Sequence, residues 1–128
     1  MSKETYKIHS QRPLSPHLQI YKPQISSVLS ILHRITGFAL YVGVILFAWW
    51  LVANAYGCGK CINSLFKISL VRVFIFGWTL ALYYHLLNGI RHLFWDIGKG
   101  YGLCIMQKTG WLVLVGTVLL SVGSWYVF

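Results

Sequence analysis

Three long apolar runs dominate the pattern of hydrophobic and polar positions in this 128-residue chain. They extend over roughly Ile35 to Tyr56, Val73 to Ile90 and Trp111 to Phe128, and polar residues gather between them and in the N-terminal segment. Each run is close to the about 20 residues with which a helix crosses the hydrocarbon core of a bilayer. Backbone groups in lipid must pair within their own segment, so the runs predict helices. The pattern therefore indicates an all-α integral membrane protein with three transmembrane helices.

The expected organisation is a single unit that covers residues 1–128. A surface arm at 1–28 precedes transmembrane helices at about 29–56, 66–92 and 110–128. We expect an ordered, extended arm because it carries three prolines, and the apolar stretch comes too late for a cleavable signal peptide. The lack of an Arg-rich, Ser-rich presequence favours a chain of bacterial or organelle-encoded origin.

Composition excludes an ordinary water-soluble domain, because 57% of the residues are hydrophobic and only 10% are charged. A net charge of +9 often accompanies nucleic-acid binding, but here the basic residues lie in the arm and near the ends of the apolar runs. Membrane topology explains them better, so no nucleic-acid partner is expected. Eight of the 11 Lys and Arg residues would share the side of the N-terminus, against three around the first connection. This excess predicts an N-terminus in the cytoplasm or matrix and a C-terminus on the opposite side.

A histidine, His85, lies within the second apolar run, where ionisable groups are costly and mark function by default. His92 follows seven residues later on the same helical stripe, with Asn88 and Gly89 between them and Asp96 one turn further. An imidazole for iron, a small residue where a ring passes and basic groups near the surface suit a planar macrocycle such as haem. The alternative is that His85 only hydrogen-bonds a carbonyl of a neighbouring helix. For His92, an interfacial pairing with Asp96 is the stronger interpretation.

The start of the first helix offers a second polar group, the SILHR sequence at residues 30–34. Ser30 and Arg34 share a helical face at i, i+4 and could present a hydroxyl and a permanent positive charge to a carbonyl-bearing ligand. Arg34 could instead be a snorkelling anchor, and Ser30 a packing residue. The predicted topology brings this segment to the same membrane side as the histidines of the second run, which favours the functional interpretation. Further along, Gly37 and Gly43 leave room for a neighbouring helix or a flat ligand.

The cysteines carry the least information. Cys58 and Cys61 form a CxxC pattern after the first run, but Ile62 stands where c-type haem attachment needs a histidine. A single CxxC also gives poor support for a zinc site. Cys58 and Cys61 are therefore either incidental thiols or a disulfide in an oxidising compartment. Cys104 is expected to be structural.

Three segments carry a resemblance to a known family: RPLSPHLQIYKPQ at 12–24, SILHRITG at 30–37 and HLLNGIRHLFWDIGKG at 85–100. Together they resemble the cytochrome b membrane-anchor family of succinate dehydrogenase, the larger of the two anchors of that complex. The match covers the arm and two of the three apolar runs in the right order, while the run from Trp111 adds only generic apolar character. The resemblance implies a single membrane-anchor domain within an oxidoreductase complex, and not an enzyme on its own.

The resemblance also implies roles for several polar residues. His85 matches the family's axial ligand of the haem b iron, and the second axial ligand comes from the other anchor subunit. Ser30, Ile31 and Arg34 fall at the site where the family binds ubiquinone, and His33 falls near the haem propionates. Arg34 would stabilise negative charge that develops on a quinone oxygen, and Ser30 would donate a hydrogen bond to a quinone carbonyl.

The implied partners are a second membrane-anchor subunit, an iron–sulfur subunit and a flavoprotein subunit, together with membrane lipid. The basic arm that contains Arg12 would lie near the iron–sulfur subunit. Electrons from succinate would then reach ubiquinone within respiratory complex II, in the tricarboxylic acid cycle and respiratory chain, at a bacterial inner membrane or a mitochondrial one. The alternatives are a fumarate reductase anchor, and a haem-free structural or pore-forming protein whose His85 stripe lines a polar path.

Overall fold

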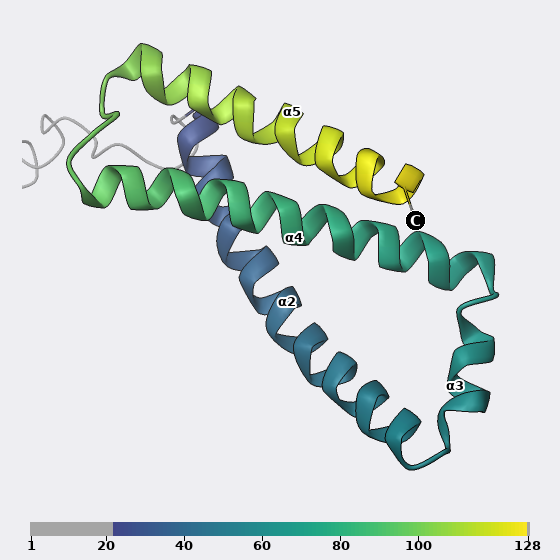
Figure 1. Cartoon of the computed structure of the whole chain (residues 1–128). Coiled ribbons are helices and arrows are strands. Elements are labelled where there is room, and N and C mark those ends of the chain that lie inside the picture. Colours follow the sequence, from purple (N-terminus) through teal and green to yellow (C-terminus); the bar gives the residue numbers. More distant parts are fainter. Residues whose placement is uncertain (1–21, 128) are drawn as a thin grey trace, which may run out of the picture.

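The computed structural model describes residues 22–127, and every regular element in that range is a helix. The elements follow one another as α2 (Ile25–Ala55), the short α3 (Gly59–Leu65), α4 (Ser69–Asp96) and α5 (Leu103–Val127) (Figure 1). Of these, α2, α4 and α5 are long and apolar enough to cross a membrane. The predicted all-α fold with three transmembrane helices is therefore confirmed, while residues 1–21 of the predicted arm lie outside the described residues.

The long helices extend beyond the apolar runs that predicted them. α2 begins at Ile25, so residues 25–28 are helical although they were assigned to the arm, and α5 begins at Leu103 where a start near 110 was expected. The predicted boundaries followed apolar content, whereas polar turns can continue a helix at the membrane surface. The three helices have 31, 28 and 25 residues. Since about 20 residues span the hydrocarbon core, their ends reach the polar interface or the helices tilt.

Glycines in the left-handed region terminate two of these helices. Gly57 after α2 and Gly98 after α4 each have a φ of 79°, which L side chains rarely adopt. At the end of α4, the amide of Gly98 donates to the Trp95 carbonyl at 2.8 Å, and the amide of Lys99 donates to the Phe94 carbonyl at 3.0 Å. These bonds satisfy carbonyls that a helix end leaves without partners, and the chain turns there toward α5.

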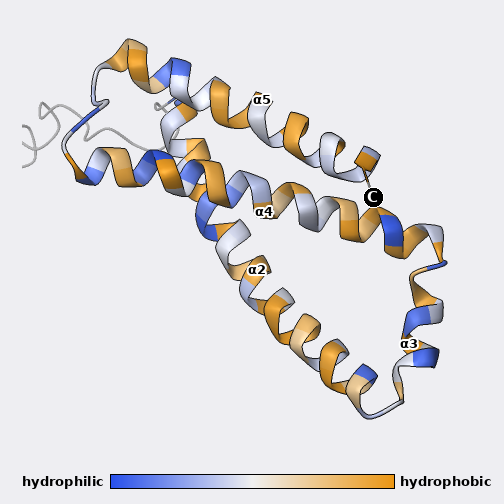
Figure 2. Ribbon diagram, in the orientation of Figure 1, coloured by the Kyte–Doolittle hydropathy of each residue, from blue (hydrophilic) through white to orange (hydrophobic). Residues whose placement is uncertain are grey.

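α4 and α5 run antiparallel and side by side, whereas α2 crosses α4 near the N-terminal end of α2 and then diverges from it (Figure 1). The short α3 bridges the gap between the diverging ends (Figure 1). The buried core lies at the crossing, where Leu29, Tyr84 and Val113 meet from the three helices. Many large apolar side chains outside this core are exposed, as expected for surfaces that contact lipid tails. Hydrophobic positions recur along all three long helices (Figure 2).

Glycines allow both outer helices to approach their neighbours closely. A Cβ at Gly110 of α5 would lie 3.1 Å from Cδ1 of Leu29 on α2. On α2, Gly43 is buried because the indole of Trp78 occupies the position that a side chain there would need. Small residues at such contacts are typical of packed membrane helices. The room that the sequence predicted at Gly43 is therefore taken by Trp78 of α4.

Buried polar side chains of α4 tie the start of α2 to the bundle. The Tyr84 hydroxyl donates a 2.7 Å hydrogen bond to the carbonyl of Leu29, and Asn88 Nδ2 donates to the same oxygen at 3.3 Å. Asn88 and Leu29 are 0% and 1% exposed. A polar group buried between helices without a partner would be costly, so these two bonds hold α2 against α4 at this point.

The same polar side chains reach α5 through Arg91. Its Nη1 donates to Asn88 Oδ1 at 3.4 Å, its Nε donates to Thr109 Oγ1 at 3.2 Å and its Nη2 donates to the Met106 carbonyl at 3.1 Å. We call Tyr84, Asn88 and Arg91 the polar hub. Because Asn88 donates to α2 and accepts from Arg91, the polar hub links all three transmembrane helices.

Asn88→Ala should destabilise the folded chain, because it removes the amide that connects α2 to Arg91. The expected loss in the free energy of unfolding is about 1–3 kcal/mol, the usual cost of leaving a buried polar group without its partner. Gln107→Ala, at an exposed polar position of α5, is the matched control and should change that free energy by less than about 0.5 kcal/mol. Unfolding of the detergent-solubilised chain by added dodecyl sulfate, followed by circular dichroism, measures both. Equal effects of the two substitutions would contradict the linking role of Asn88.

Candidate functional site

The polar residues of α4 fall on two adjacent stripes. The polar hub occupies the first stripe, which faces α5 and the start of α2. His85, Gly89 and His92, at i, i+4 and i+7, occupy the second stripe, which faces His33 of α2. The prediction that Asn88 lies with the histidines is therefore wrong, because a shift of one residue turns the side chain by about 100° around the helix.

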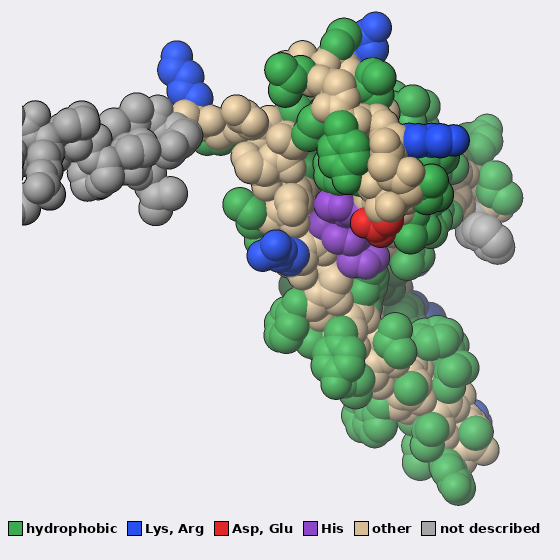
Figure 3. Space-filling view, turned by 90° about the vertical axis from the view of Figure 1, so that its left-hand side faces the viewer, with side chains coloured by type: hydrophobic (Ala, Val, Ile, Leu, Met, Phe, Trp, Pro, Cys, Tyr) green, Lys and Arg blue, Asp and Glu red, His purple; other side chains and the backbone are tan. Residues whose placement is uncertain are grey.

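Three imidazoles meet where α2 crosses α4, and we call His33, His85 and His92 the histidine cluster. The rings of His33 and His85 are stacked, with centroids 4.0 Å apart and an interplanar angle of 7°. The His92 ring is tilted by 45° against that of His33, with centroids 5.1 Å apart. Figure 3 shows the histidine side chains gathered on one face of the molecule. The polar segments of the first and second runs thus meet, as the sequence predicted.

Hydrogen bonds determine which ring nitrogen of His85 is free. Its Nδ1 lies 3.2 Å from the carbonyl oxygen of His33 and 3.3 Å from Thr36 Oγ1. A carbonyl can only accept, and the Thr36 hydroxyl already donates to the carbonyls of Leu32 and His33, at 2.9 and 3.0 Å. The His33 carbonyl therefore requires a proton on Nδ1, and the Thr36 oxygen can accept from the same proton. In the neutral ring the lone pair then lies on Nε2, which makes no hydrogen bond within residues 22–127.

Gly37 sets how closely the His85 ring approaches α2. A Cβ at Gly37 would lie 3.0 Å from Cε1 of His85, 3.6 Å from its Nδ1 and 3.9 Å from its Nε2. The shortest of these separations is too small for a carbon side chain, because packed atoms repel at such distances unless the ring moves. The room predicted at Gly37 is therefore filled by the imidazole of α4.

Beyond the histidine cluster, the diverging α2 and α4 border an apolar groove of about 1110 Å³. His85 and Gly37 line the groove near the crossing, and Tyr41 and Trp78 line it further along the two helices. Leu65 of α3 closes it where that helix bridges the gap. The groove has space for a flat macrocycle or for a helix of another subunit beside His85.

The histidine cluster offers one well-placed metal ligand and not a complete metal site. No group of three or more His, Cys, Asp or Glu side chains that could hold a metal ion occurs in the described part of the chain. The parallel stacking of His33 and His85 also prevents their rings from converging on one ion. An iron bound to Nε2 of His85 therefore needs its other ligands from a macrocycle and from outside residues 22–127.

The other two histidines of the cluster have different surroundings. His33 Nδ1 is buried and has no hydrogen-bond partner among the described residues. His92 packs edge-on against Trp95, with centroids 5.0 Å apart and an interplanar angle of 87°. The alternative pairing of His92 with Asp96 is not found within the described range. The buried His33 nitrogen is therefore left without a hydrogen-bond partner within residues 22–127.

The three predicted ligand-binding residues of α2 lie beside His33 in sequence, on a more open surface. Ser30 is half-buried, whereas Ile31 and Arg34 are exposed. Neither the Ser30 hydroxyl nor the Arg34 guanidinium has a hydrogen-bond or ion-pair partner among the residues described. A hydroxyl donor and a permanent cation are thus free to meet a ligand at the membrane surface.

The cysteines lie away from the histidine cluster. Cys58 and Cys104 are exposed free thiols, and the structural role expected for Cys104 stays a prediction. Cys58 Sγ lies 4.0 Å from the carbonyl of Tyr56. The side chain of Cys61 lies outside the described residues, and the disulfide considered for the CxxC pattern stays untested.

Sequence reasoning missed the side chains that hold the histidine cluster in position. Tyr84, Thr36 and Thr109 were not singled out, although each makes a polar contact between helices. The i, i+4, i+7 spacing of Tyr84, Asn88 and Arg91 was an available signal, because residues at that spacing share a helical face. The threonines gave no comparable signal, since Thr in a helix often bonds only its own backbone.

The chain is similar to a known family of membrane subunits over most of its length. Residues 9–123 match the model of the succinate dehydrogenase/fumarate reductase transmembrane subunit family. The succinate dehydrogenase cytochrome b556 subunit of Rickettsia conorii is 47% identical over 98% of this chain and 99% of that protein. The cytochrome b556 subunit of Paracoccus denitrificans is 41% identical, over 91% of this chain and 92% of that protein. The mitochondrial cytochrome b560 subunit of Sus scrofa is 44% identical, over 89% of this chain and 70% of that protein.

Proposed function

This chain belongs to the succinate dehydrogenase/fumarate reductase transmembrane subunit family, and we infer that it anchors succinate dehydrogenase, respiratory complex II, in the inner membrane as its cytochrome b subunit. Three membrane-spanning helices and relatives from bacteria and mitochondria fit a multi-pass inner-membrane protein. Membership of that complex implies association with other complex II subunits, and the cytochrome b relatives imply a haem b cofactor. The finer proposals concern the residues that hold the haem and the quinone.

We propose that Nε2 of His85 ligates the haem b iron. The observation that carries this assignment is the pair of acceptors at Nδ1, the His33 carbonyl and the Thr36 hydroxyl, which leaves the lone pair on Nε2. A hydrogen bond at the other ring nitrogen orients a metal-ligating histidine and raises its basicity. With one ligand from this chain, a second protein ligand to the iron would come from the second membrane-anchor subunit. The haem, when bound, supplies one-electron redox chemistry.

The surroundings of His85 fit this group. Gly37 lets the His85 ring lie against α2, and the adjoining groove provides an apolar surface suited to a porphyrin. His33 would lie near the haem propionates, since its ring is stacked on that of His85. His92, held between the rings of His33 and Trp95, would support this arrangement by packing.

Ser30, Ile31 and Arg34 would bind ubiquinone where α2 reaches the membrane surface. Electrons released from succinate in the flavoprotein subunit would arrive there through the iron–sulfur subunit. Arg34 would stabilise the negative charge that develops on a quinone oxygen, because a guanidinium stays protonated in proteins. Ser30 would donate a hydrogen bond to a quinone carbonyl, and Ile31 would contact the apolar part of the ring. Neither polar side chain has a competing partner within the described residues.

Two other functions account for fewer of the observations. A fumarate reductase anchor would share this architecture, but the relatives from Rickettsia, Paracoccus and Sus scrofa are succinate dehydrogenase subunits. A haem-free pore would need a continuous polar path, whereas the groove beside His85 is lined mainly by apolar side chains. The role of an anchor that binds haem and quinone explains both the histidine cluster and the unpartnered residues of α2.

Arg34→Gln should lower the succinate–ubiquinone reductase activity of the assembled complex by about tenfold or more, since a hydrogen bond to a charged group contributes about 1.5–3 kcal/mol. Succinate oxidation with a water-soluble dye should continue, because the dye takes electrons without the quinone site. Arg72→Gln, at the start of α4 and therefore near the opposite membrane face, is the matched control and should preserve both activities. Unchanged quinone turnover in Arg34→Gln would remove Arg34 from the site.

His85→Ala should abolish the b-type absorbance of the purified complex, whereas His92→Ala should preserve it. His85→Met provides a variant that retains a possible iron ligand, and its haem should show a higher reduction potential, because methionine ligation raises that potential. Reduced-minus-oxidised spectra and a redox titration measure both effects. A preserved b-type spectrum with an unchanged potential in the two His85 variants would show that another residue ligates the iron.

A further inference from the structure

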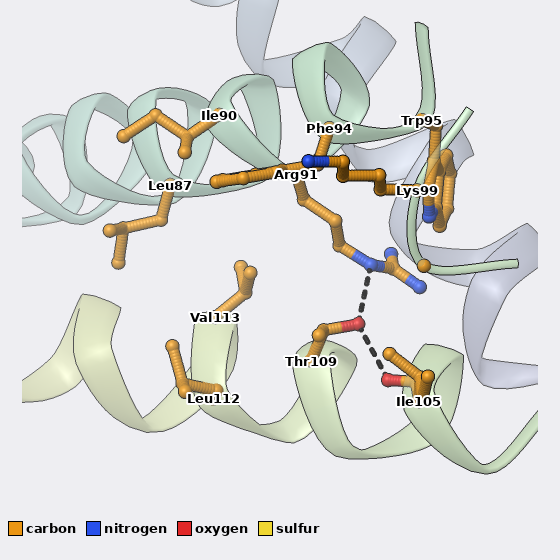
Figure 4. A pocket seen from close by; sticks show the side chains of 11 residues that line it. Leu87, Ile90, Arg91, Phe94, Trp95, Lys99, Ile105, Thr109, Leu112 and Val113 are labelled. Atoms are coloured by element: carbon orange, nitrogen blue, oxygen red, sulfur yellow. Dashed lines mark hydrogen bonds between the residues drawn. The ribbon is translucent and has the colours of Figure 1, made fainter. Parts of the chain in front are cut away.

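A second pocket, of about 330 Å³, lies between α4 and α5 beside the polar hub. Figure 4 shows Arg91 and Lys99 at this pocket, with Arg91 reaching toward α5. We call it the α4–α5 pocket. It contains none of the residues proposed to bind haem or quinone, so it is a separate site. Its remaining lining is mainly apolar and comes from both helices, chiefly Leu87, Ile90, Phe94, Ile105, Leu112 and Val113.

Arg91 is a buried cation whose hydrogen-bond partners within residues 22–127 are all neutral. The residue is 5% exposed, and its guanidinium donates to the Thr109 hydroxyl, the Asn88 amide and the Met106 carbonyl. The one acidic side chain within residues 22–127 is Asp96, which is exposed and makes no bond to Arg91. A buried charge without a counter-ion is costly in a low-dielectric medium. The α4–α5 pocket is therefore suited to an anion from outside the described chain.

The guanidinium is held in place but still has donors to offer. A guanidinium carries five N–H groups, and three of its nitrogens each make one bond here. The ring of Trp95 covers it, with the Cζ atom 4.2 Å from the ring centroid. Arginine presents its donors in a planar fork that matches the oxygens of a phosphate. Lys99 adds a second cation to the lining of the pocket.

We propose that the α4–α5 pocket binds one anionic membrane phospholipid. Its phosphate would lie at Arg91 and Lys99, and one acyl chain would follow the apolar side chains toward Leu112. The end of α4 and the start of α5 meet at this pocket, which places it near the membrane surface, where phospholipid phosphates lie. The predicted topology puts this end of the bundle on the cytoplasmic or matrix side. Basic pockets between transmembrane helices on that side are typical binding sites for anionic lipids.

The combination of charge and apolar lining favours a phospholipid over other occupants. A soluble phosphate would meet the two cations and leave the apolar lining uncovered. A helix of a partner subunit would cover the apolar lining, but it would also have to carry a carboxylate at the matching position to neutralise Arg91. A phospholipid supplies the anion and the apolar chain in one molecule.

Native mass spectrometry of the complete complex, purified in mild detergent, tests the proposal. The complex is given equal amounts of phosphatidylglycerol and phosphatidylcholine with matched acyl chains, and one phosphatidylglycerol should stay bound at this pocket. Lys99→Gln should lower its retention by about fivefold, because one basic residue near a lipid phosphate contributes about 1 kcal/mol. Lys108→Gln is the matched control, since Lys108 is an exposed lysine near the start of α5 that does not line the pocket, and it should leave retention unchanged.

Leu112→Trp tests the apolar half of the pocket without changing its charge. Leu112 is 67% exposed, so the variant should fold, and the larger indole would occupy the path of the acyl chain. Retention of phosphatidylglycerol should fall in this variant as well.

Four outcomes would overturn the proposal. Equal losses of phosphatidylglycerol in Lys99→Gln and Lys108→Gln would show that retention depends on general surface charge and not on this pocket. Equal retention of phosphatidylglycerol and phosphatidylcholine would show that the pocket does not select an anionic lipid. Unchanged retention in Leu112→Trp would place the lipid at another site, and the absence of any retained lipid would show that the pocket does not hold one in the complex.

Discussion

The carbonyl of Leu29 accepts two hydrogen bonds from α4, and the rest of the structure depends on this contact. Lipid tails are as apolar as the outer faces of the helices, so hydrophobic burial alone gives α2 little preference for α4. A buried polar contact does give that preference, because the Tyr84 hydroxyl and the Asn88 amide are buried between the helices and have no water to bond there. Holding α2 at Leu29 brings His33, one turn further along, against the ring of His85.

The two stripes of α4 have different consequences for function. The polar hub faces α5 and α2 and holds the bundle together, and its Arg91 keeps a positive charge that no described carboxylate neutralises. The histidine stripe faces the space that opens where α2 diverges from α4. The His85 ring donates from Nδ1 to acceptors on α2, so a rotation of the ring would lose those bonds. Helix packing therefore determines both the tautomer of His85 and the atom that is left for a ligand.

The apolar runs were sufficient to predict three membrane helices, because a helix satisfies its own backbone groups in lipid. The same reasoning missed the first turns of α2 and α5, where polar residues interrupt the apolar run. Helical spacing and topology predicted that His85 would meet the segment at 30–34. They could not show that Asn88 lies on another face of α4 than the histidines, since residues on neighbouring stripes are only one position apart in the sequence. The free nitrogen of His85 was also beyond sequence reasoning, because it depends on Thr36 and a backbone carbonyl of another helix. The assignments of Ser30 and Arg34 to the quinone stay predictions.

The central claim is that this chain supplies one of two axial haem ligands through Nε2 of His85. The most direct measurement is pulsed electron paramagnetic resonance on the oxidised complex, assembled from this chain with nitrogen-15 histidine and from unlabelled partner subunits. One axial nitrogen should couple to the iron as nitrogen-15 and the other as nitrogen-14. Two axial nitrogen-14 couplings would show that His85 does not ligate the iron, and two nitrogen-15 couplings would show that no partner shares the haem.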